Sequence, residues 1–445
     1  MSRRNISGFL DSLPEEEIAA KQVVDIVRKH FELAGGAPIS TPAFEKLETL
    51  LMSGEHENSH EIYGIYRLGR PPETEKTGYG LAFDLTIPLA RYVAQHSEKL
   101  IFPFRRYQIQ RVWRGERPQA GRHREFTQAD FDIIGRNRLD ALADAEVPAI
   151  INRIFDEIGI NNFKLRVSNL KLLGGYVAGR SLPPSTARRI FRTIDKIERL
   201  GHGKTRDLLV SDAGLSEGIA DELIELISRS VPPGKVGLAL TDSYLNREMA
   251  EGVNELETLV DNMIVYGIPR DRIEIDLSIV RGMEYYTGTV YEVFLAGHNN
   301  GSVCSGGRYE NLVRARARFP GVGMSIGITR LVQSLIESGI IKSGPRTPAS
   351  VLVTVLDRNY VDKYVALTNI LRDEKISAEM YLGSGKIGDQ LRYASRKGFL
   401  YAVILGADEI SKSMVQVRDL VLGEQSEMDI SGLMLKLAHV RRQSI

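Results

Sequence analysis

The chain has 445 residues, of which 43% are hydrophobic and 26% are charged, with 58 lysines and arginines against 57 aspartates and glutamates. This composition is typical of a soluble globular protein, and the length predicts two or three domains because it exceeds one ordinary core. The balanced charge gives no overall attraction for nucleic acid, and the single cysteine, Cys304, excludes internal disulfides and any cysteine-based metal site.

The N-terminal segment MSRRNISGFLDSLPEEE lacks the apolar region of a secretory signal, and no apolar run is long enough for a membrane helix. We therefore expect a cytoplasmic protein without membrane contact. Apolar residues at helical spacing predict a helix over 15–34, which Gly35-Gly36 ends. An extended segment follows from Pro38.

Alternating polar and apolar residues predict strands over 61–68 and 79–87, followed by a helix with Pro88 in its first turn. The segments KLIFPFRRYQIQRVWRGE and REFTQADFDIIG alternate in the same way on either side of RPQAGRH. This arrangement predicts two antiparallel strands joined by a flexible basic loop.

Helix 139–158 and strand 162–169 precede an inserted helical module over about 170–240. Strand patterns return over 272–280 and 287–296, then a glycine-rich turn at CSGGRY and a strand followed by a helix in GVGMSIGITRLVQSLI. The Gly/Pro/Ser-rich segment 338–350 predicts a domain boundary. Beyond it, a β-α-β-α-β-β pattern predicts an open sheet with parallel strands.

The arginine-rich hairpin concentrates groups that suit a phosphate ligand. Forked guanidinium groups donate paired hydrogen bonds to phosphate or carboxylate oxygens without losing their charge. Phe126, between charged neighbours, can offer a ring on which a base stacks. The alternative is a solvated surface hairpin. The residues concerned are Arg114, Glu116, Arg122, Arg124 and Phe126.

Two further segments are candidates for a site, although each alone is typical of a turn with aromatic filler. Arg281 ends a predicted strand and is followed by Tyr285 and Tyr286, which alternation predicts to point to opposite faces, one into the core and one into a pocket. Gly306-Gly307 would allow the backbone to approach a ligand closely.

The segment HENSH, 56–60, has the spacing of a zinc metalloprotease motif, which requires both histidines on one helical face. Asn58 and Ser59 are weak helix formers, and a strand pattern follows directly. We interpret the match as a coincidence in a loop, with a zinc protease as the alternative that a metal assay would test.

The order of the motifs is more specific than any one of them. TPAFEKLE, LAFDLTIPLARY, RGERPQAGRHREFTQADFDIIG, VRGMEYYTGTVYE, CSGGRY and GVGMSIGITRL follow one another over most of the chain. In this order the chain closely resembles the histidyl-tRNA synthetases, which are class II aminoacyl-tRNA synthetases. Two segments, RGMEYY and GGRY, resemble the signatures of the histidine enzymes. Two others, RGERP…REF and GITRL, resemble the general class II motifs.

The resemblance implies an α+β fold: a class II antiparallel-sheet catalytic domain over 1–338 with a helical insertion at about 170–240, and an α/β anticodon-binding domain over 350–445. It implies a histidine–tRNA ligase that uses ATP to activate L-histidine and transfers it to tRNA(His). It also implies a homodimer, magnesium that arrives with ATP, and no tightly bound protein metal.

The same resemblance implies roles for individual residues. Arg114 and Arg281 would be catalytic, flanking the α-phosphate and the attacking carboxylate. The other ATP-binding residues would be Glu116, Arg122, Phe126 and Arg330, with Phe126 and Arg330 on either side of adenine. The histidine-binding residues would be Asp84, Thr86 and Gln128 at the ammonium group, and Asp132, Tyr285 and Tyr286 around the imidazole. For Asp132, the alternative is a structural salt bridge to a neighbouring arginine.

Two positions depart from the family pattern. Ala82 stands where the family commonly has arginine, and Thr329 where an acid usually precedes the third-motif arginine. The first departure weakens a supporting ion pair, and the second alters the expected metal and phosphate contacts. The alternative function is therefore a synthetase-like regulatory or sensor protein that binds histidine or tRNA without catalysis, against which the retained Arg114, Arg281 and Arg330 argue.

Overall fold

The computed structural model describes residues 5–51, 61–69, 78–118, 121–240, 246–280, 285–297, 301–313, 315–341 and 344–440. The chain divides into two compact units, Met1–Leu10 with Val23–Ile340, and Asp11–Gln22 with Ile341–Ile445. The domain limits 1–338 and 350–445 stay predictions. Among the described residues, no helix is long and apolar enough to cross a membrane.

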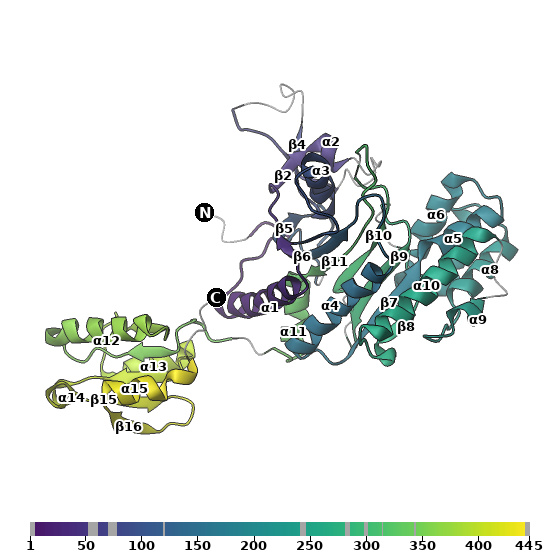
Figure 1. Cartoon of the computed structure of the whole chain (residues 1–445). Coiled ribbons are helices and arrows are strands. Elements are labelled where there is room, and N and C mark those ends of the chain that lie inside the picture. The colour runs from purple at the N-terminus through teal and green to yellow at the C-terminus, as the bar shows by residue number, and fades with distance from the viewer. Residues whose placement is uncertain are drawn as a thin grey trace. The chain divides into compact units, whose positions relative to one another are not determined.

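An eight-stranded sheet forms the centre of the first unit (Figure 1). Its strands pair antiparallel except at the two outermost pairs, where β1 runs parallel to β5 and β8 parallel to β7. The antiparallel-rich sheet expected from the sequence is therefore confirmed. In spatial order the strands are β1 (Ala37–Pro38), β5 (Phe104–Trp113), β6 (Glu125–Ile134), β11 (Gly321–Gly327), β10 (Cys304–Tyr309), β9 (Thr289–Leu295), β7 (Phe163–Asn169) and β8 (Ile273–Ile275).

The two faces of this sheet differ in chemistry, because successive side chains of a strand point to opposite sides. On one face Phe131 of β6 contacts Phe31 of α1 (Pro14–Leu33), with ring centroids 5.3 Å apart, and both side chains are fully buried. On the other face the register places Asp132 opposite Arg106 of β5 and Gly323 of β11. The sheet therefore has one helix-covered apolar face and one polar face.

The predicted helices and the helical module are present in the first unit (Figure 1). One long helix, α10 (Arg247–Val265), was not predicted; its buried stripe includes Met249, Val253 and Leu256, and it packs against α5 and α4. The remaining helices are α2 (Leu47–Leu50), α3 (Thr86–His96), α4 (Leu142–Ile158), α5 (Leu170–Gly179), α6 (Pro184–Ile194), α7 (Ile197–Ser211), α8 (Glu217–Ile227), α9 (Val236–Leu240), α11 (Ile328–Glu337) and the 3₁₀ turn Arg270–Arg272.

Three strand predictions need correction. The patterns over 61–68 and 79–87 form only β3 (Gly64–Ile65) and β4 (Tyr79–Leu81), which join β2 (Phe44–Lys46) in a small sheet of order β2-β4-β3. The pattern over 272–280 is a strand only in β8. These strands pair with a short partner or lie at a sheet edge, so pairing ends before the alternating pattern does.

The second unit is a five-stranded sheet of order β13-β12-β14-β15-β16. Strand β12 pairs parallel with β13 and β14, as predicted, whereas β14-β15 and β15-β16 are antiparallel. Its elements are β12 (Val351–Val353), α12 (Val361–Asp373), β13 (Ala378–Met380), α13 (Ile387–Lys397), β14 (Tyr401–Ile404), α14 (Ala407–Lys412), β15 (Val415–Asp419), β16 (Gln425–Met428), α15 (Ile430–Lys436) and the 3₁₀ turns Arg358–Tyr360 and Ala438–Val440.

Candidate active site

A cavity of about 510 Å³ lies in the first unit, against the polar face of the large sheet. Every residue to which the resemblance assigns a role and that the structure describes lines it, whereas Arg281 lies outside the described residues, as does HENSH. Arg124, the other hairpin candidate, does not line the cavity: its Nε donates to the Glu116 carbonyl at 3.1 Å and its Nη1 to the Ser7 carbonyl at 3.3 Å. The predicted residues that the cavity brings together are Asp84, Thr86, Arg114, Glu116, Arg122, Phe126, Gln128, Asp132, Tyr285, Tyr286 and Arg330.

Arginines gather at one part of this cavity, and backbone carbonyls orient two of them. Arg114 Nε donates to the Phe83 carbonyl at 3.0 Å, and its guanidinium lies 5.3 Å from the Phe126 ring centroid. Arg330 Nε donates to the Gly121 carbonyl at 3.0 Å, and its Nη1 to the Ser302 carbonyl at 2.7 Å. These hydrogen bonds to backbone carbonyls fix the orientation of both guanidinium groups at the cavity.

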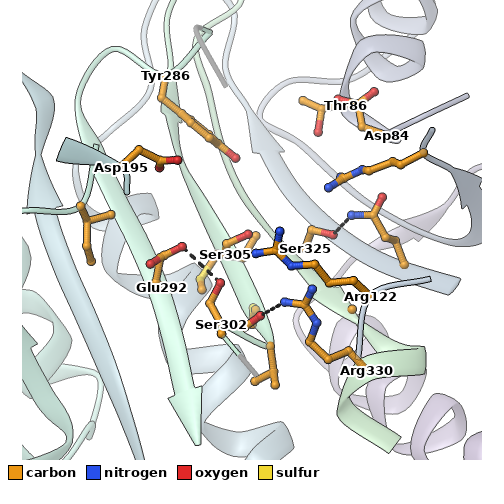
Figure 2. A pocket seen from close by; sticks show the side chains of 18 of the residues that line it. Asp84, Thr86, Arg122, Asp195, Tyr286, Glu292, Ser302, Ser305, Ser325 and Arg330 are labelled. Atoms are coloured by element: carbon orange, nitrogen blue, oxygen red, sulfur yellow. Dashed lines mark hydrogen bonds between the residues drawn. The ribbon is translucent and has the colours of Figure 1, made fainter. Parts of the chain in front are cut away.

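Arg122 belongs to the same group, and its side chain is 50% exposed. Glu116 lies between two arginines, with oxygens 3.9 Å from Arg114 Nη1 and 3.6 Å from Arg122 Nη1. These separations are too long for hydrogen bonds. The Glu116 carboxylate therefore reduces the positive potential of the two arginines without forming a close ion pair. Figure 2 shows Arg122 and Arg330 extending into the cavity from the same side.

Carboxylates gather at another part of the cavity, on the strands themselves. Asp132 of β6 is 3% exposed, and its Oδ2 lies 2.6 Å from Nη2 of the fully buried Arg106. Its Oδ1 accepts a hydrogen bond from the Tyr309 hydroxyl at 2.9 Å. Asp130, two residues earlier, is 4.0 Å from the same guanidinium nitrogen. The salt bridge considered as an alternative for Asp132 therefore exists, although Asp132 also lines the cavity.

Burial sets the protonation of these carboxylates. It raises the pKa of Asp84 to about 6, although the Ile87 N–H, donating at 3.2 Å, and Arg114 oppose the rise. Burial likewise raises the pKa of Asp130 to about 7, with Arg106 opposing the rise and Asp132 adding to it. The pKa of Asp132 is also raised by burial, against the pull of Arg106 and Tyr309. The buried guanidinium of Arg106 thus lowers the pKa of all three carboxyl groups.

Glycines on the central strands leave room for these side chains. The segment CSGGRY, predicted as a turn, is strand β10, and its glycines meet neighbouring strands rather than a ligand. A Cβ at Gly306 would lie 2.0 Å from the Gly323 carbonyl oxygen, and one at Gly307 would lie 2.6 Å from that of Thr289. A Cβ at Gly323 would lie 2.1 Å from Asp132 Oδ1. These positions exclude any side chain.

The two tyrosines do not point to opposite faces, as strand alternation predicted. Tyr285 and Tyr286 lie outside any strand, are both half-buried, and contact each other with ring centroids 4.6 Å apart. Both line the cavity, and Tyr285 also packs edge-on against Tyr309 at 6.3 Å. The prediction failed because it assumed an extended backbone at these residues.

The two departures from the family pattern have clear local explanations. Ala82 is fully buried, and its backbone joins Ala43 and Trp113 through hydrogen bonds of 3.0 and 2.9 Å. Thr329 Oγ1 accepts a hydrogen bond from the Thr127 N–H at 2.9 Å, which ties the start of α11 to β6. Thr329 therefore has a structural role, beside an Arg330 that still reaches the cavity.

Sequence reasoning missed several polar residues. Arg106, Asp130 and Tyr309 were not selected, although the β5-β6 register would have placed Arg106 opposite Asp132. The helical module also contributes Asp195 and Glu198 to the cavity lining. Arg308 of GGRY has a structural role, since its Nε lies 3.0 Å from Asp144 Oδ1. Within the described residues, no group of three His, Cys, Asp or Glu side chains is placed to hold a metal.

Comparisons with known proteins match both parts of the chain. The family model described as histidyl-tRNA synthetase matches residues 8–331, and that described as anticodon binding domain matches residues 350–439. A histidine–tRNA ligase of Clostridium tetani is 38% identical over 429 residues, covering 96% of this chain and 95% of the relative. One of Xanthomonas oryzae pv. oryzae is 37% identical over 456 residues, covering 96% and 95%.

Solved structures give the same picture. The crystal structure of histidyl-tRNA synthetase from Nostoc sp. PCC 7120 matches with a TM-score of 0.86 and 35% identity, covering 99% of both chains. A protein from Bacillus halodurans, described as an ATP phosphoribosyltransferase regulatory subunit/histidyl-tRNA synthetase, matches with a TM-score of 0.73 and 21% identity, covering 92% of this chain and 100% of its own. At that identity the second match shows the fold alone.

Proposed function

The chain belongs to the histidyl-tRNA synthetase family and acts as a histidine–tRNA ligase, and we propose that histidine and ATP react in the cavity described above. The observation that carries this proposal is the separation of charge along its wall, with arginines in one part and buried carboxylates in another. ATP brings phosphates to the first, and histidine brings a cationic ammonium group to the second. The regulatory alternative is not favoured, because the relatives that are 38% and 37% identical and cover 96% of the chain are named histidine–tRNA ligases.

The reaction has two steps. The histidine carboxylate attacks the α-phosphorus of ATP, which gives histidyl-adenylate and releases pyrophosphate. The terminal ribose hydroxyl of the tRNA then attacks the histidyl carbonyl carbon, and AMP leaves. Charge develops on oxygen in both steps, so catalysis consists mainly of positioning and electrostatic stabilisation. In this proposal Arg114, held by the Phe83 carbonyl, is placed between the carboxylate and the α-phosphate, and Arg281 takes the opposite side.

The rest of ATP binds along the arginine-bearing wall. Arg122 and Arg330 take the distal phosphates, and Phe126 stacks on adenine, with Arg330 on its other face. Glu116 accepts a hydrogen bond from the adenine amino group. Magnesium arrives with ATP and is part of the substrate complex, because Mg²⁺ prefers phosphate oxygens and water to an all-protein cage.

Histidine binds against the strands. Asp84, Thr86 and Gln128 hold its ammonium group, and Asp132 accepts from one ring nitrogen. Tyr286 lies beside the other ring nitrogen, with Tyr285 packed against it. Since Asp132 already pairs with Arg106 and Tyr309, its carboxylate is fixed in place before histidine arrives.

The tRNA engages a larger part of the protein. In the proposal the loop from Pro118 to His123 meets the acceptor end of the tRNA, and the region matched by the anticodon-binding model meets the anticodon of tRNA(His). A homodimer and a cytoplasmic location are proposed from the family alone.

The test of this function is histidine-dependent exchange of pyrophosphate into ATP by the full-length protein, followed by charging of tRNA(His). We expect exchange with L-histidine and none with phenylalanine or glutamine. The phenylalanine side chain has neither donor nor acceptor, and glutamine carries both on one terminal amide rather than at two positions of a ring. Absence of histidine-dependent exchange in a folded sample would overturn the proposal.

A further inference from the structure

Three buried oxygen atoms on the cavity wall have no hydrogen-bond partner. They are Asp84 Oδ2, Gln128 Oε1 and Asp130 Oδ1, on residues that are 2%, 8% and 3% exposed. Among the described residues that line the cavity, no other buried side-chain polar atom lacks a partner. All three are acceptors, and an unsatisfied buried acceptor is costly, so a ligand that brings hydrogen-bond donors would relieve all three.

Asp130 lines the cavity, and its neighbours leave Oδ1 without a hydrogen-bond partner. Its strand neighbours are Gln108 of β5 and Ser325 of β11, and Arg106 Nη2 lies 4.0 Å from its other oxygen, Oδ2. Gln128 Nε2 donates to Ser325 Oγ at 2.9 Å, so the amide nitrogen is occupied and its oxygen is free. Figure 2 shows this bond at Ser325, with Asp84 on the facing segment.

We propose that Asp130 is a specificity-determining residue that accepts a hydrogen bond from the α-ammonium group of histidine, together with Asp84 and Gln128. An ammonium group has three N–H donors and no acceptor, which matches three free acceptors on one wall. Asp132 suits this role less well, because Tyr309 donates to its Oδ1, Arg106 lies 2.6 Å from its Oδ2, and its remaining acceptor capacity is assigned to the imidazole ring. The proposal rests on the proposed function and adds a residue to its amino-acid site.

Charge supports the same conclusion. The ionisable groups that face Asp130 are Arg106 on β5, Asp132 on its own strand and Asp84 on the segment before α3, whereas Ser325 on β11 is neutral. Several carboxylates share one buried guanidinium, so a cationic ligand relieves their mutual repulsion. Because burial raises the pKa of Asp130 to about 7, much of this carboxyl is protonated in the empty site below that pH. Binding of the ammonium group then releases a proton.

The experiment compares the wild-type protein with Asp130→Asn, using inhibition constants in the pyrophosphate exchange assay at pH 8. Histidinol carries the ammonium group and the ring, whereas imidazolepropionate carries the ring but no ammonium group. We expect the variant to bind histidine and histidinol about 10- to 100-fold more weakly and imidazolepropionate equally well. The KM for ATP should not change.

A pH series separates this role from a structural one. At pH 6 the wild-type carboxyl is mostly protonated and resembles the amide, so the ratio of histidine constants between variant and wild type should fall by up to about tenfold. The imidazole titration of histidine is common to both proteins and cancels in the ratio. The matched control is Asp261→Asn on the exposed face of α10, for which every ratio should remain near one.

Each outcome decides the matter. Equal weakening of histidinol and imidazolepropionate would place Asp130 at the ring, and no weakening, or a ratio independent of pH, would make it structural; either result overturns the proposal. If wild-type protein shows no histidine-dependent exchange, the proposed function itself fails. If Asp130→Asn does not fold, the same assays use Asp130→Ser. Calorimetry then also measures the proton release on histidine binding to the wild-type protein as a function of pH.

Discussion

The arginine-bearing part of the cavity takes its charged side chains from a loop and from the start of a helix, and water reaches them. The carboxylate-bearing part takes most of its charged side chains from central strands, where they are buried. The side chains of Arg122 and Glu116 are 50% and 30% exposed, whereas those of Arg106 and Asp132 are 0% and 4% exposed. Exposed charges interact weakly and can move to meet a ligand, while buried charges interact strongly and cannot move. The arginine-bearing part therefore suits a large polyanion, and the carboxylate-bearing part a small amino acid.

The sharpest test of this contrast is Arg106→Met. The change leaves Asp132 and Asp130 buried without their cation, so we expect the free energy of unfolding to fall by about 3–5 kcal/mol at pH 8. Denaturant unfolding measures the loss. The matched control is Arg105→Met on the same strand, whose guanidinium is 33% exposed and pairs with Glu146 at 2.7 Å. A loss as large in the control would mean that burial does not distinguish the two arginines.

The corresponding change at the arginine-bearing part is Arg114→Ala. It removes a charged donor beside the reacting atoms, so we expect transition-state stabilisation in the pyrophosphate exchange reaction to fall by about 2–5 kcal/mol, with little loss of folding stability. Arg111→Ala, 65% exposed on the same hairpin, serves as the control and should retain activity. Near-normal exchange by Arg114→Ala would contradict the assignment. The same loss is expected for Arg281→Ala.

Asp132→Asn asks whether a buried ion pair can also select the substrate. The variant should lower kcat/KM for histidine by about 1–3 kcal/mol and that for ATP much less, because the ring donor loses its charged acceptor. Tyr309→Phe, which removes only the hydroxyl that donates to Asp132, should give a smaller change of the same kind. Equal effects on both substrates would leave Asp132 as a purely structural partner of Arg106.

The smallest expected effect is on stability rather than activity. A carboxyl whose pKa is raised on folding contributes stability at low pH, and this contribution is lost as the pH rises through its folded pKa, here about 7. The free energy of unfolding of Asp130→Asn, relative to wild type, should therefore increase by about 1–2 kcal/mol between pH 6 and pH 8. A relative stability that is flat over this range would show that Asp130 is ionised throughout.

The sequence identified the arginine-bearing part more completely than the other. Arg114, Arg122, Phe126 and Arg330 lie in motifs whose residue types point to phosphate and base chemistry, and all line the cavity. The class of fold and the β5-β6 hairpin also followed from alternation, because one face of β6 carries Ala129, Phe131 and Ile133 and the other is polar. Residue type and local motif were sufficient to identify residues whose roles depend on their own side-chain groups rather than on neighbours from other strands.

The buried part could not be derived in the same way. The roles of Arg106 and Asp130 depend on strand register and on which atoms remain unpaired, and neither is visible in a single sequence. The glycines of β10 misled the prediction, since glycine marks a turn more often than close strand packing. Helix α10 was missed because its polar residues obscured its buried stripe.

The absence of a side chain at Gly323 has a consequence for efforts to change which amino acid this enzyme accepts. A single methyl group there would lie 2.1 Å from Asp132 Oδ1 and 2.8 Å from the Phe131 carbonyl oxygen. Directed evolution that varies only residues with functional groups would leave this position untouched, yet alanine at 323 would displace the carboxylate while keeping every polar atom. A mutation that adds only a methyl group and no polar atom could therefore alter the amino-acid preference. Mutant libraries for re-engineering this site should include the residues of β11.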